Sequence, residues 1–147
     1  MSESENTTHR VVASIGLTSR LGAEYFLETS RVFGGVVPGD TLTTLVFLTI
    51  VSRNLKAVEG DGASMFAGDI PDTLRAPVTV YAVAKDLGLS YETVRRHVRR
   101  LVDSGVCERG GAGLVVPASV FNRPEFVRAL ARNHENVQRL MRSLQDL

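Results

Sequence analysis

The chain has 147 residues, of which 44% are hydrophobic, and a formal net charge of +1 at pH 7. This length suits one compact domain, and this composition is ordinary for a globular core. The most apolar stretch, residues 42–51, contains three threonines and is too short for a membrane span, which needs about 20 residues. The first ten residues are polar and lack the apolar run of a secretory signal. We therefore expect a cytoplasmic protein with no membrane segment.

Charge is unevenly distributed along the chain. Residues 1–74 carry 5 basic and 9 acidic side chains, whereas residues 75–147 carry 12 basic and 7 acidic ones. Of the 17 basic residues, 15 are arginine, which suits bidentate contacts to phosphate and guanine. A GC-rich coding sequence would produce the same bias. The basic C-terminal half is the part of the chain that favours a nucleic-acid contact.

The first 40 residues contain two predicted regions. The first ten residues are polar, and we expect residues 1–15 to form a disordered tail. In residues 16–40, apolar side chains recur at helical spacing between positions 21 and 33 and are followed by two glycines. This pattern predicts an N-terminal helix, which we expect to be a dimerisation element.

A second helix is predicted from a cap at Asp40 or Thr41 to about Val58. It is apolar around most of its circumference, which indicates a central, buried helix. Residues 59–76 are rich in glycine and acidic side chains and predict a long loop that leads into a short strand at Val78. Because loops of this length are unusual unless anchored, we expect the pair Met65-Phe66 to pin it to the body.

Residues 79–105 carry the most informative pattern of the sequence. Thr79 can cap a short helix whose apolar face is Val80, Val83, Ala84 and Leu87, and Gly88 follows where a left-handed residue is needed. Ser90 can cap a second helix. The predicted core stripe of that helix recurs at spacings of three and four and consists of Tyr91, Val94, Val98, Leu101 and Val102.

The opposite face of this second helix is basic. It carries Glu92, Thr93, Arg96, Arg99, Arg100 and Asp103, with Arg95 and His97 on its flanks. The alternative is a solvated surface without a binding role, in which Glu92 pairs with Arg96 and Arg99 with Asp103. Each such pair would stabilise the helix by roughly 0.2–0.5 kcal/mol. The pattern otherwise matches a helix that is presented to the major groove of DNA.

The residues that follow predict a β-hairpin. Residues 106–109 and 114–116 are short β-prone runs, they are separated by the glycine-rich turn at 110–113, and Pro117 closes the second run. Cys107 is the single cysteine, which excludes an internal disulfide, and we expect it to fill a small core position on the first strand. An oxidant-sensing role is the alternative for Cys107.

Across roughly residues 41–117 the chain resembles the winged helix-turn-helix transcriptional regulators of bacteria. The resemblance is carried by Ala84, Gly88, Val94, Val98, Gly105 and the turn at residues 110–113. In length and helix order the chain looks most like the multiple-antibiotic-resistance regulator (MarR) group, and its helix-turn-helix also looks like that of the isocitrate-lyase-type (IclR) regulators. The resemblance implies a mainly α fold with a small β-hairpin wing and flanking N- and C-terminal helices. No ligand residues can be carried over from either group, so a small-molecule effector stays an open alternative.

The C-terminal element, residues 118–147, is predicted to be mostly one long helix. Asn122, Pro124 and Glu125 form a start signal of a cap, a first-turn proline and a reach-back carboxylate. A heptad seam follows at Phe126, Leu130, Asn133, Val137, Leu140, Leu144 and Leu147. We expect this seam to form a second dimerisation element, and packing on its own domain is the alternative.

Together these features predict a homodimeric, sequence-specific regulator that binds an inverted repeat in double-stranded DNA. Base edges are assigned to Thr93, Arg96 and His97, and phosphates to Ser90, Tyr91, Arg95, Arg99 and Arg100. Arg109 on the hairpin is assigned to the minor groove.

A protein-binding adaptor and an enzyme are the two other classes of function to compare with DNA binding. A winged helix that binds proteins as an adaptor would expose apolar or mixed residues on its second helix, where this chain carries arginines. An enzyme is not expected, because His9, His97 and His134 lie in unrelated elements and no paired nucleophile, metal-ligand set or cofactor motif accompanies them. No cofactor or metal ion is therefore assigned.

Overall fold

The computed structural model describes residues 2–58 and 66–147. This part of the chain is mainly helical and contains one two-stranded antiparallel hairpin. The elements in chain order are α1 (Glu3–Gly34), α2 (Thr41–Leu55), the 3-10 turn η2 (Asp72–Leu74), α3 (Val80–Leu87), α4 (Tyr91–Asp103), β1 (Glu108–Gly110), β2 (Gly113–Val115), α5 (Ala118–Phe121) and α6 (Pro124–Gln145). Residues 59–65, the first part of the predicted loop with Met65, lie outside the described residues.

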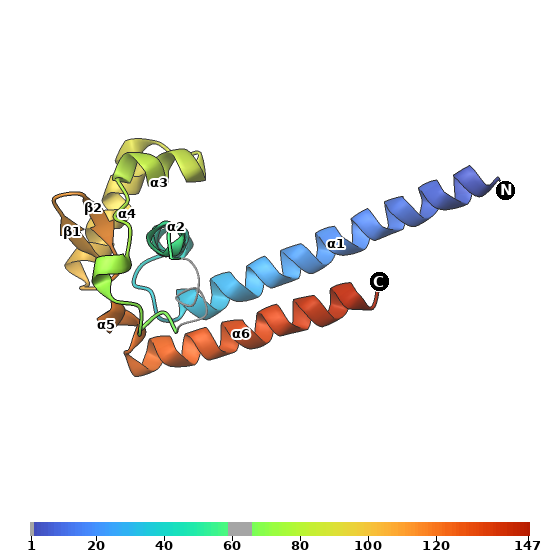
Figure 1. Cartoon of the computed structure of the whole chain (residues 1–147). Coiled ribbons are helices and arrows are strands. Elements are labelled where there is room, and N and C mark those ends of the chain that lie inside the picture. The colour runs from blue at the N-terminus through green and yellow to red at the C-terminus, as the bar shows by residue number, and fades with distance from the viewer. Residues whose placement is uncertain (1, 59–65) are drawn as a thin grey trace.

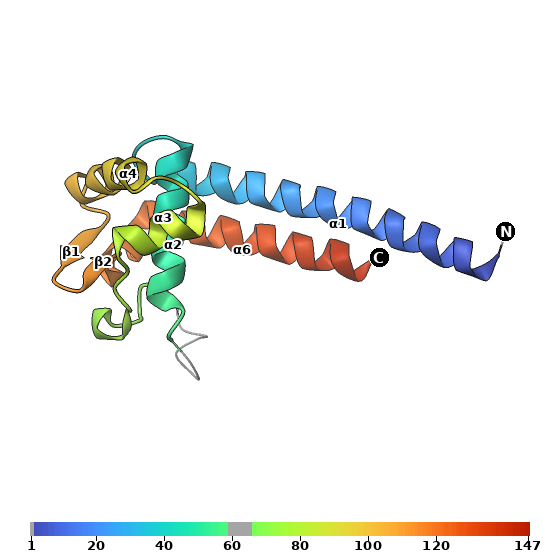
Figure 2. The ribbon, with the colours of Figure 1, turned by 90° about the horizontal axis from the view of Figure 1, so that it is seen from above.

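The molecule has a head and a stalk (Figures 1 and 2). We call α1 and α6 the stalk, because both views show them side by side and pointing away from the other elements, which form the head. The amide Nδ2 of Asn136 donates to the Tyr25 carbonyl at 3.0 Å and to Thr29 Oγ1 at 3.1 Å. Thr29 in turn donates to Asn133 Oδ1 at 2.8 Å. These bonds fix the pairing of the two helices within one chain.

The head is built around α2, as its apolar sequence predicts. Phe47 and Ile50 are completely buried. The Phe47 ring lies 6.5 Å from that of Phe121 and 5.8 Å from that of Phe126, so α2 holds α5 and the start of α6 in one aromatic cluster. Aromatic pairs at such distances stabilise a core beyond the area that they bury. α2 ends at Leu55, three residues before the predicted end.

Three of the predicted helix caps are confirmed. Asp40, Thr79 and Ser90 are the N-caps of α2, α3 and α4, and each side chain accepts a hydrogen bond from the backbone N–H three residues later. Gly88 ends α3 with φ of 65°, a left-handed conformation that glycine adopts without strain. The turn between α3 and α4 therefore has the geometry expected from the sequence.

The hairpin pairs Arg109 with Leu114 and Gly110 with Gly113. Val78 forms a bridge to Leu114, so the short segment before α3 packs against β2. Gly113 has φ of 139°, and a Cβ at this position would lie 2.7 Å from the Val78 carbonyl oxygen. Glycine is required here because the two backbones approach so closely.

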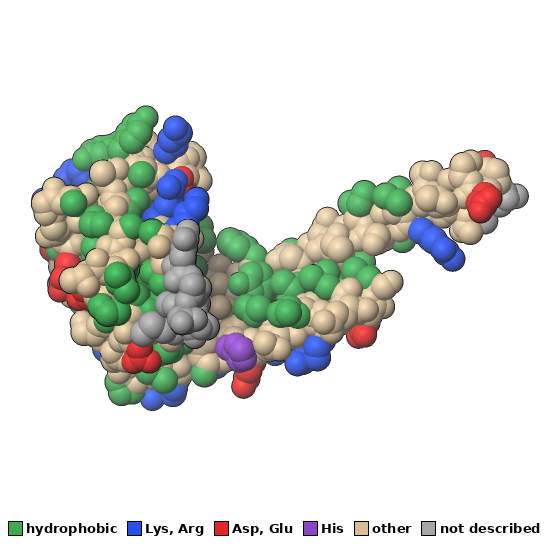
Figure 3. Space-filling model, in the orientation of Figure 1, with side chains coloured by type: hydrophobic (Ala, Val, Ile, Leu, Met, Phe, Trp, Pro, Cys, Tyr) green, Lys and Arg blue, Asp and Glu red, His purple; other side chains and the backbone are tan. Residues whose placement is uncertain are grey.

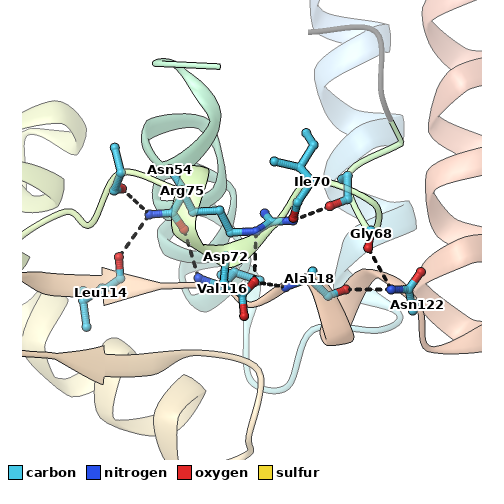
Figure 4. A network of polar contacts seen from close by, with 11 residues as sticks. Asn54, Gly68, Ile70, Asp72, Arg75, Leu114, Val116, Ala118 and Asn122 are labelled. Carbon is cyan, nitrogen blue, oxygen red and sulfur yellow. Dashed lines mark hydrogen bonds and ion pairs between the residues drawn. The ribbon is translucent and has the colours of Figure 1, made fainter. Parts of the chain in front are cut away.

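A buried polar network joins α2 to the hairpin (Figure 4). The Asn54 amide donates to the carbonyls of Ala76, at 2.8 Å, and Leu114, at 3.0 Å, and its oxygen accepts from the Val116 N–H at 2.9 Å. The Arg75 guanidinium, also buried, lies 5.2 Å from the centre of the Phe121 ring. Arg75 donates to Ala67 and Ile70 carbonyls and forms an ion pair with Asp72 at 3.4 Å.

Three sequence predictions are corrected by this structure. Residues 3–15 are helical and not a disordered tail, because Ser2 and Glu5 form a capping box at the start of α1. Asn122 does not cap α6, whose N-cap is Arg123; the Asn122 amide donates to the Gly68 carbonyl at 2.9 Å. Tyr91 is 53% exposed and does not belong to the core stripe of α4.

The heptad seam of α6 packs within its own chain, which was the alternative to packing between chains. Phe126 is buried, Leu130 packs against the core, and Asn133 bonds to α1. Leu144 and Leu147 at the end of the seam stay exposed. An amphipathic stripe specifies that a helix has a partner, but not which helix that is.

Candidate nucleic-acid interface

Three apolar residues hold α4 on the head and so determine which face it exposes. Val94, Val98 and Leu101 are completely buried. The opposite side carries Arg96, Arg99 and Arg100, all exposed. The division of α4 into an apolar and a basic face agrees with the sequence prediction. A row of exposed arginines on a firmly packed helix provides donors whose positions are set before any ligand binds.

The first turn of α4 contains two internal contacts. The Ser90 hydroxyl accepts from the Thr93 N–H at 3.1 Å and donates to Thr93 Oγ1 at 2.8 Å. Arg95 forms a bidentate pair with Glu92, with Nε and Nη2 at 3.0 Å and 2.7 Å from the carboxylate oxygens. This pair lowers the pKa of Glu92 and raises that of Arg95. Glu92 thus pairs with Arg95. The alternative of a purely solvated surface predicted that it pairs with Arg96.

The structure brings Arg109 next to two arginines of α4. Arg95, Arg99 and Arg109 line a hollow of about 320 Å³ between α4 and β1, together with Val102 and Asp103. Three guanidinium groups and one carboxylate share this space, so its net charge is positive. Guanidinium groups bind phosphate oxygens through charge-assisted hydrogen bonds, and this hollow has the composition of a phosphate contact.

His97 lies on the flank of α4 that faces α2. Its side chain is 14% exposed, and Nδ1 lies 2.8 Å from Thr43 Oγ1 and 3.6 Å from Asp40 Oδ1. The pKa of Asp40 is lowered, first by the hydrogen bond from the Thr43 N–H and further by His97 and Arg100. His97 therefore joins α4 to the start of α2, which is a different position from the base-edge role that the sequence suggested.

Arg100 lies on the same flank as His97. A Cβ at Gly39, in the turn before α2, would come within 2.9 Å of Arg100 Cδ, so the arginine side chain crosses this turn. Gly39 also has φ of 101°, a conformation that favours glycine. The structure thus separates Arg100, which lies over the turn, from Arg96 and Arg99 on the open face.

Two exposed tyrosines extend the surface toward the hairpin. Tyr81 is 67% exposed and Tyr91 53% exposed, and both line a shallow hollow of about 360 Å³ with Arg109 and the hairpin glycines. Sequence reasoning missed Tyr81. Its position in the sequence could have indicated it, because Tyr81 lies outside the apolar face of α3. An aromatic side chain exposed there has no role in the core and is a candidate for a contact surface.

Cys107 lies directly before β1 and is buried. Burial raises the pKa of its thiol to about 11. A thiol that stays protonated at neutral pH is a poor nucleophile, so its environment is that of a core side chain rather than of an oxidant sensor.

The described residues contain neither a candidate metal site nor a candidate membrane span. In residues 2–58 and 66–147, no three histidine, cysteine, aspartate or glutamate side chains lie close enough together to hold a metal ion. No helix in this part of the chain combines the length and the apolar character needed to cross a bilayer. Comparisons with protein families, with curated proteins and with solved structures give no significant match.

Proposed function

We propose that the chain is a winged helix-turn-helix protein that binds double-stranded DNA with sequence preference. In this proposal α4 enters the major groove and the β1–β2 hairpin is the wing beside it. The observation that carries the proposal is the open face of α4, where Arg96 and Arg99 are held by a buried stripe and Arg109 of the hairpin faces the same side.

The structure refines the assignment of contacts in this proposal. Thr93 and Arg96 remain the side chains for base edges, because they lie in the N-terminal part of α4 on its outer side. Ser90 and Tyr91 remain phosphate contacts at the start of the helix. The hollow between α4 and the hairpin supports phosphate contacts for Arg95, Arg99 and Arg109. His97 supports the interface by holding α4 and is no longer assigned to a base.

Arg95 would exchange partners on binding. Its guanidinium is bound to Glu92 in the free protein. A phosphate would replace that carboxylate as the anion, and Glu92 would turn to solvent because 62% of its side chain is already exposed. Exposed ion pairs contribute at most about 1 kcal/mol, so breaking this pair costs little free energy.

We further propose that the protein acts as a homodimer. Two copies of α4 related by a two-fold axis would enter major grooves about 34 Å apart, and the bound sequence would be an inverted repeat. The long stalk supports this part of the proposal, since it offers a surface outside the head on which two chains can pair.

Selection of bound sequences from a random pool of double-stranded DNA tests the proposal directly. We expect enrichment of an inverted repeat, with an affinity that falls steeply between about 50 and 200 mM salt. The double substitution Arg96→Ala/Arg99→Ala should abolish the enrichment. The control Arg128→Ala/Arg142→Ala removes the same charge from exposed positions of α6 and should retain it.

Two outcomes would contradict the proposal. If both double variants lose affinity equally, the attraction is general to a basic protein and does not come from α4. If the folded protein enriches no sequence, a protein-binding adaptor becomes the better explanation of this fold.

A further inference from the structure

The N-terminal half of α1 has no partner within the described part of its own chain. Every residue from 2 to 16 is exposed, whereas the buried residues of α1, Leu21, Val32 and Phe33, all lie further along the helix. Among the exposed ones are three large apolar side chains, Val11, Val12 and Ile15, which are 53–61% exposed. Isolated helices of about this length are marginal in water, so a helix here needs packing from another molecule.

A groove of about 870 Å³ lies in the corner between stalk and head, and half of the residues that line it are apolar. These are Phe26 of α1, Leu87 of α3, and Leu45, Leu48 and Leu55 of α2. We call it the corner groove. Phe26 is 51% exposed within it. Figure 3 shows hydrophobic side chains both along the protruding part of α1 and where the stalk meets the head.

The exposed stripe and the corner groove lie on the same side of α1. Stepping about 100° per residue, Val12, Ile15, Ser19, Gly22 and Phe26 fall within about 80° of one another. Val12 and Phe26 are equally distant in sequence from Ser19. A second copy turned about a two-fold axis near Ser19 would therefore place its Val12 next to Phe26 of the first.

The centre of this stripe, around Ser19, carries only small side chains. A Cβ at Gly16 or at Gly22 would meet nothing within 4 Å, and Ser19 between them is exposed. Small residues let two helices approach closely at their crossing point. The larger apolar side chains at both ends of the stripe would then pack in the flanking regions, where the helices diverge.

Charges of opposite sign lie in the first turn of α1 and at the corner groove, although Arg10 adds one positive charge further along α1. The first turn of α1 carries Glu3 and Glu5. At the edge of the corner groove, Arg53 pairs with Asp86 at 2.6 Å, and Lys56 and Lys85 also lower the pKa of that carboxyl, so three cations surround one anion. Attraction between these charges favours the orientation in which the acidic N-terminus of α1 approaches the basic rim, over the opposite orientation of the helix.

We propose that a second copy of this chain covers the stripe: α1 pairs antiparallel with α1 of the partner, and residues 8–15 of each copy dock in the corner groove of the other. Two-fold symmetry forms this contact twice, which helps it to reach the roughly 800 Å² per partner of a standard stable interface. The inference deepens the homodimer of the proposed function by assigning its surface.

Disulfide trapping tests the register. In the double variant Val12→Cys/Leu48→Cys, mild oxidation should produce a covalent dimer within minutes. The two positions cannot join within one chain, because position 12 lies fourteen residues, or about 21 Å of helix, from Phe26 at the groove. The matched control Ser14→Cys/Leu48→Cys turns the thiol about 160° away and should remain mostly monomeric on a non-reducing gel. Equal trapping of the two variants, or none, would overturn the proposed docking.

The mass in solution tests the interface without a cross-link. We expect a dimer for the unmodified chain by sedimentation equilibrium, at least a ten-fold weaker dimer for Val12→Glu, and a change below two-fold for the control Ser14→Glu. Both positions are exposed in the single chain, so neither variant should unfold it. A dimer that Val12→Glu leaves intact would assign the interface to another face.

A chain that stays monomeric at micromolar concentration would also overturn the proposal. If that monomer co-sediments with phosphatidylserine-containing vesicles, and Val12→Glu prevents it, the stripe would belong to a lipid surface instead. Binding of the monomer to DNA with a single half-site is measured in parallel. It depends on α4 alone, so a failed dimer and a failed DNA-binding function give different results.

Discussion

Substitution of Asn54 by alanine should strongly destabilise the head. Asn54 is completely buried on α2 and makes three side-chain hydrogen bonds to backbone groups, one in the segment before α3 and two in and directly after β2. Asn54→Ala would leave the Ala76 carbonyl and the Val116 N–H without these partners. The Leu114 carbonyl would keep a second bond, from the Val78 N–H at 3.1 Å.

The magnitude follows from these two groups. A buried polar group without a partner costs about 1–3 kcal/mol, so we expect the free energy of unfolding to fall by about 4 kcal/mol. For a chain of this size that corresponds to a drop in Tm of about 12 °C, at about 3 °C per kcal/mol. The loss should be larger than for an average substitution, which costs about 1 kcal/mol.

Urea denaturation followed by circular dichroism at 222 nm measures this effect. All variants are compared at one protein concentration, since the proposed dimer would make stability depend on concentration. Ser52→Ala, at an exposed position of the same helix, is the control and should change the free energy by less than about 0.5 kcal/mol. A loss below about 1 kcal/mol for Asn54→Ala would refute the reasoning that this amide holds the hairpin to α2.

Three further predictions concern the interface, the hairpin and the thiol. Arg96→Ala should weaken binding to the selected DNA by about 1–3 kcal/mol and relax base preference at one position; an equal loss on all sequences would make Arg96 a phosphate contact. Gly113→Ala should lower the free energy of unfolding by about 2 kcal/mol or more, because its φ is 139° and its Cβ would meet the Val78 carbonyl at 2.7 Å. Gly111→Ala, where a Cβ meets nothing within 4 Å, should not, and equal urea midpoints would contradict this. Since burial raises the pKa of Cys107 to about 11, an aromatic disulfide reagent at pH 8 should label it only in urea, and stability should fall as pH rises from about 9 to 11.

Local features of the fold were predictable from the sequence. A cap requires only one side-chain oxygen and a backbone N–H three residues away, so Asp40, Thr79 and Ser90 could be identified without knowledge of the tertiary structure. The left-handed turn at Gly88 is equally local. The basic face of α4 followed from helical periodicity, because its apolar stripe fixes the orientation of the remaining side chains.

Contacts between distant residues were not predictable in this way. Asn122 has the sequence context of a helix cap, yet its amide bonds to Gly68, 54 residues earlier. His97 contacts Thr43, also 54 residues away, and this contact holds it against α2, away from the exposed basic face of α4. The polar composition of the first ten residues predicted disorder, whereas the structure shows a helix that starts with a capping box at Ser2. The box alone does not predict that helix, because a capped helix still needs a packing partner.

The position of α2 connects the two proposals. At its N-terminus Thr43 bonds to His97 of α4, and near its C-terminus Asn54 holds β2, so one helix of about 22 Å sets the spacing between α4 and the hairpin. Between these points Leu45 and Leu48 line the corner groove. Leu48 therefore belongs both to the proposed docking surface and to the helix that positions the two parts proposed to contact DNA. It follows that bulky substitutions at Leu48 should change dimerisation and half-site affinity together, whereas Val12→Glu should change dimerisation alone.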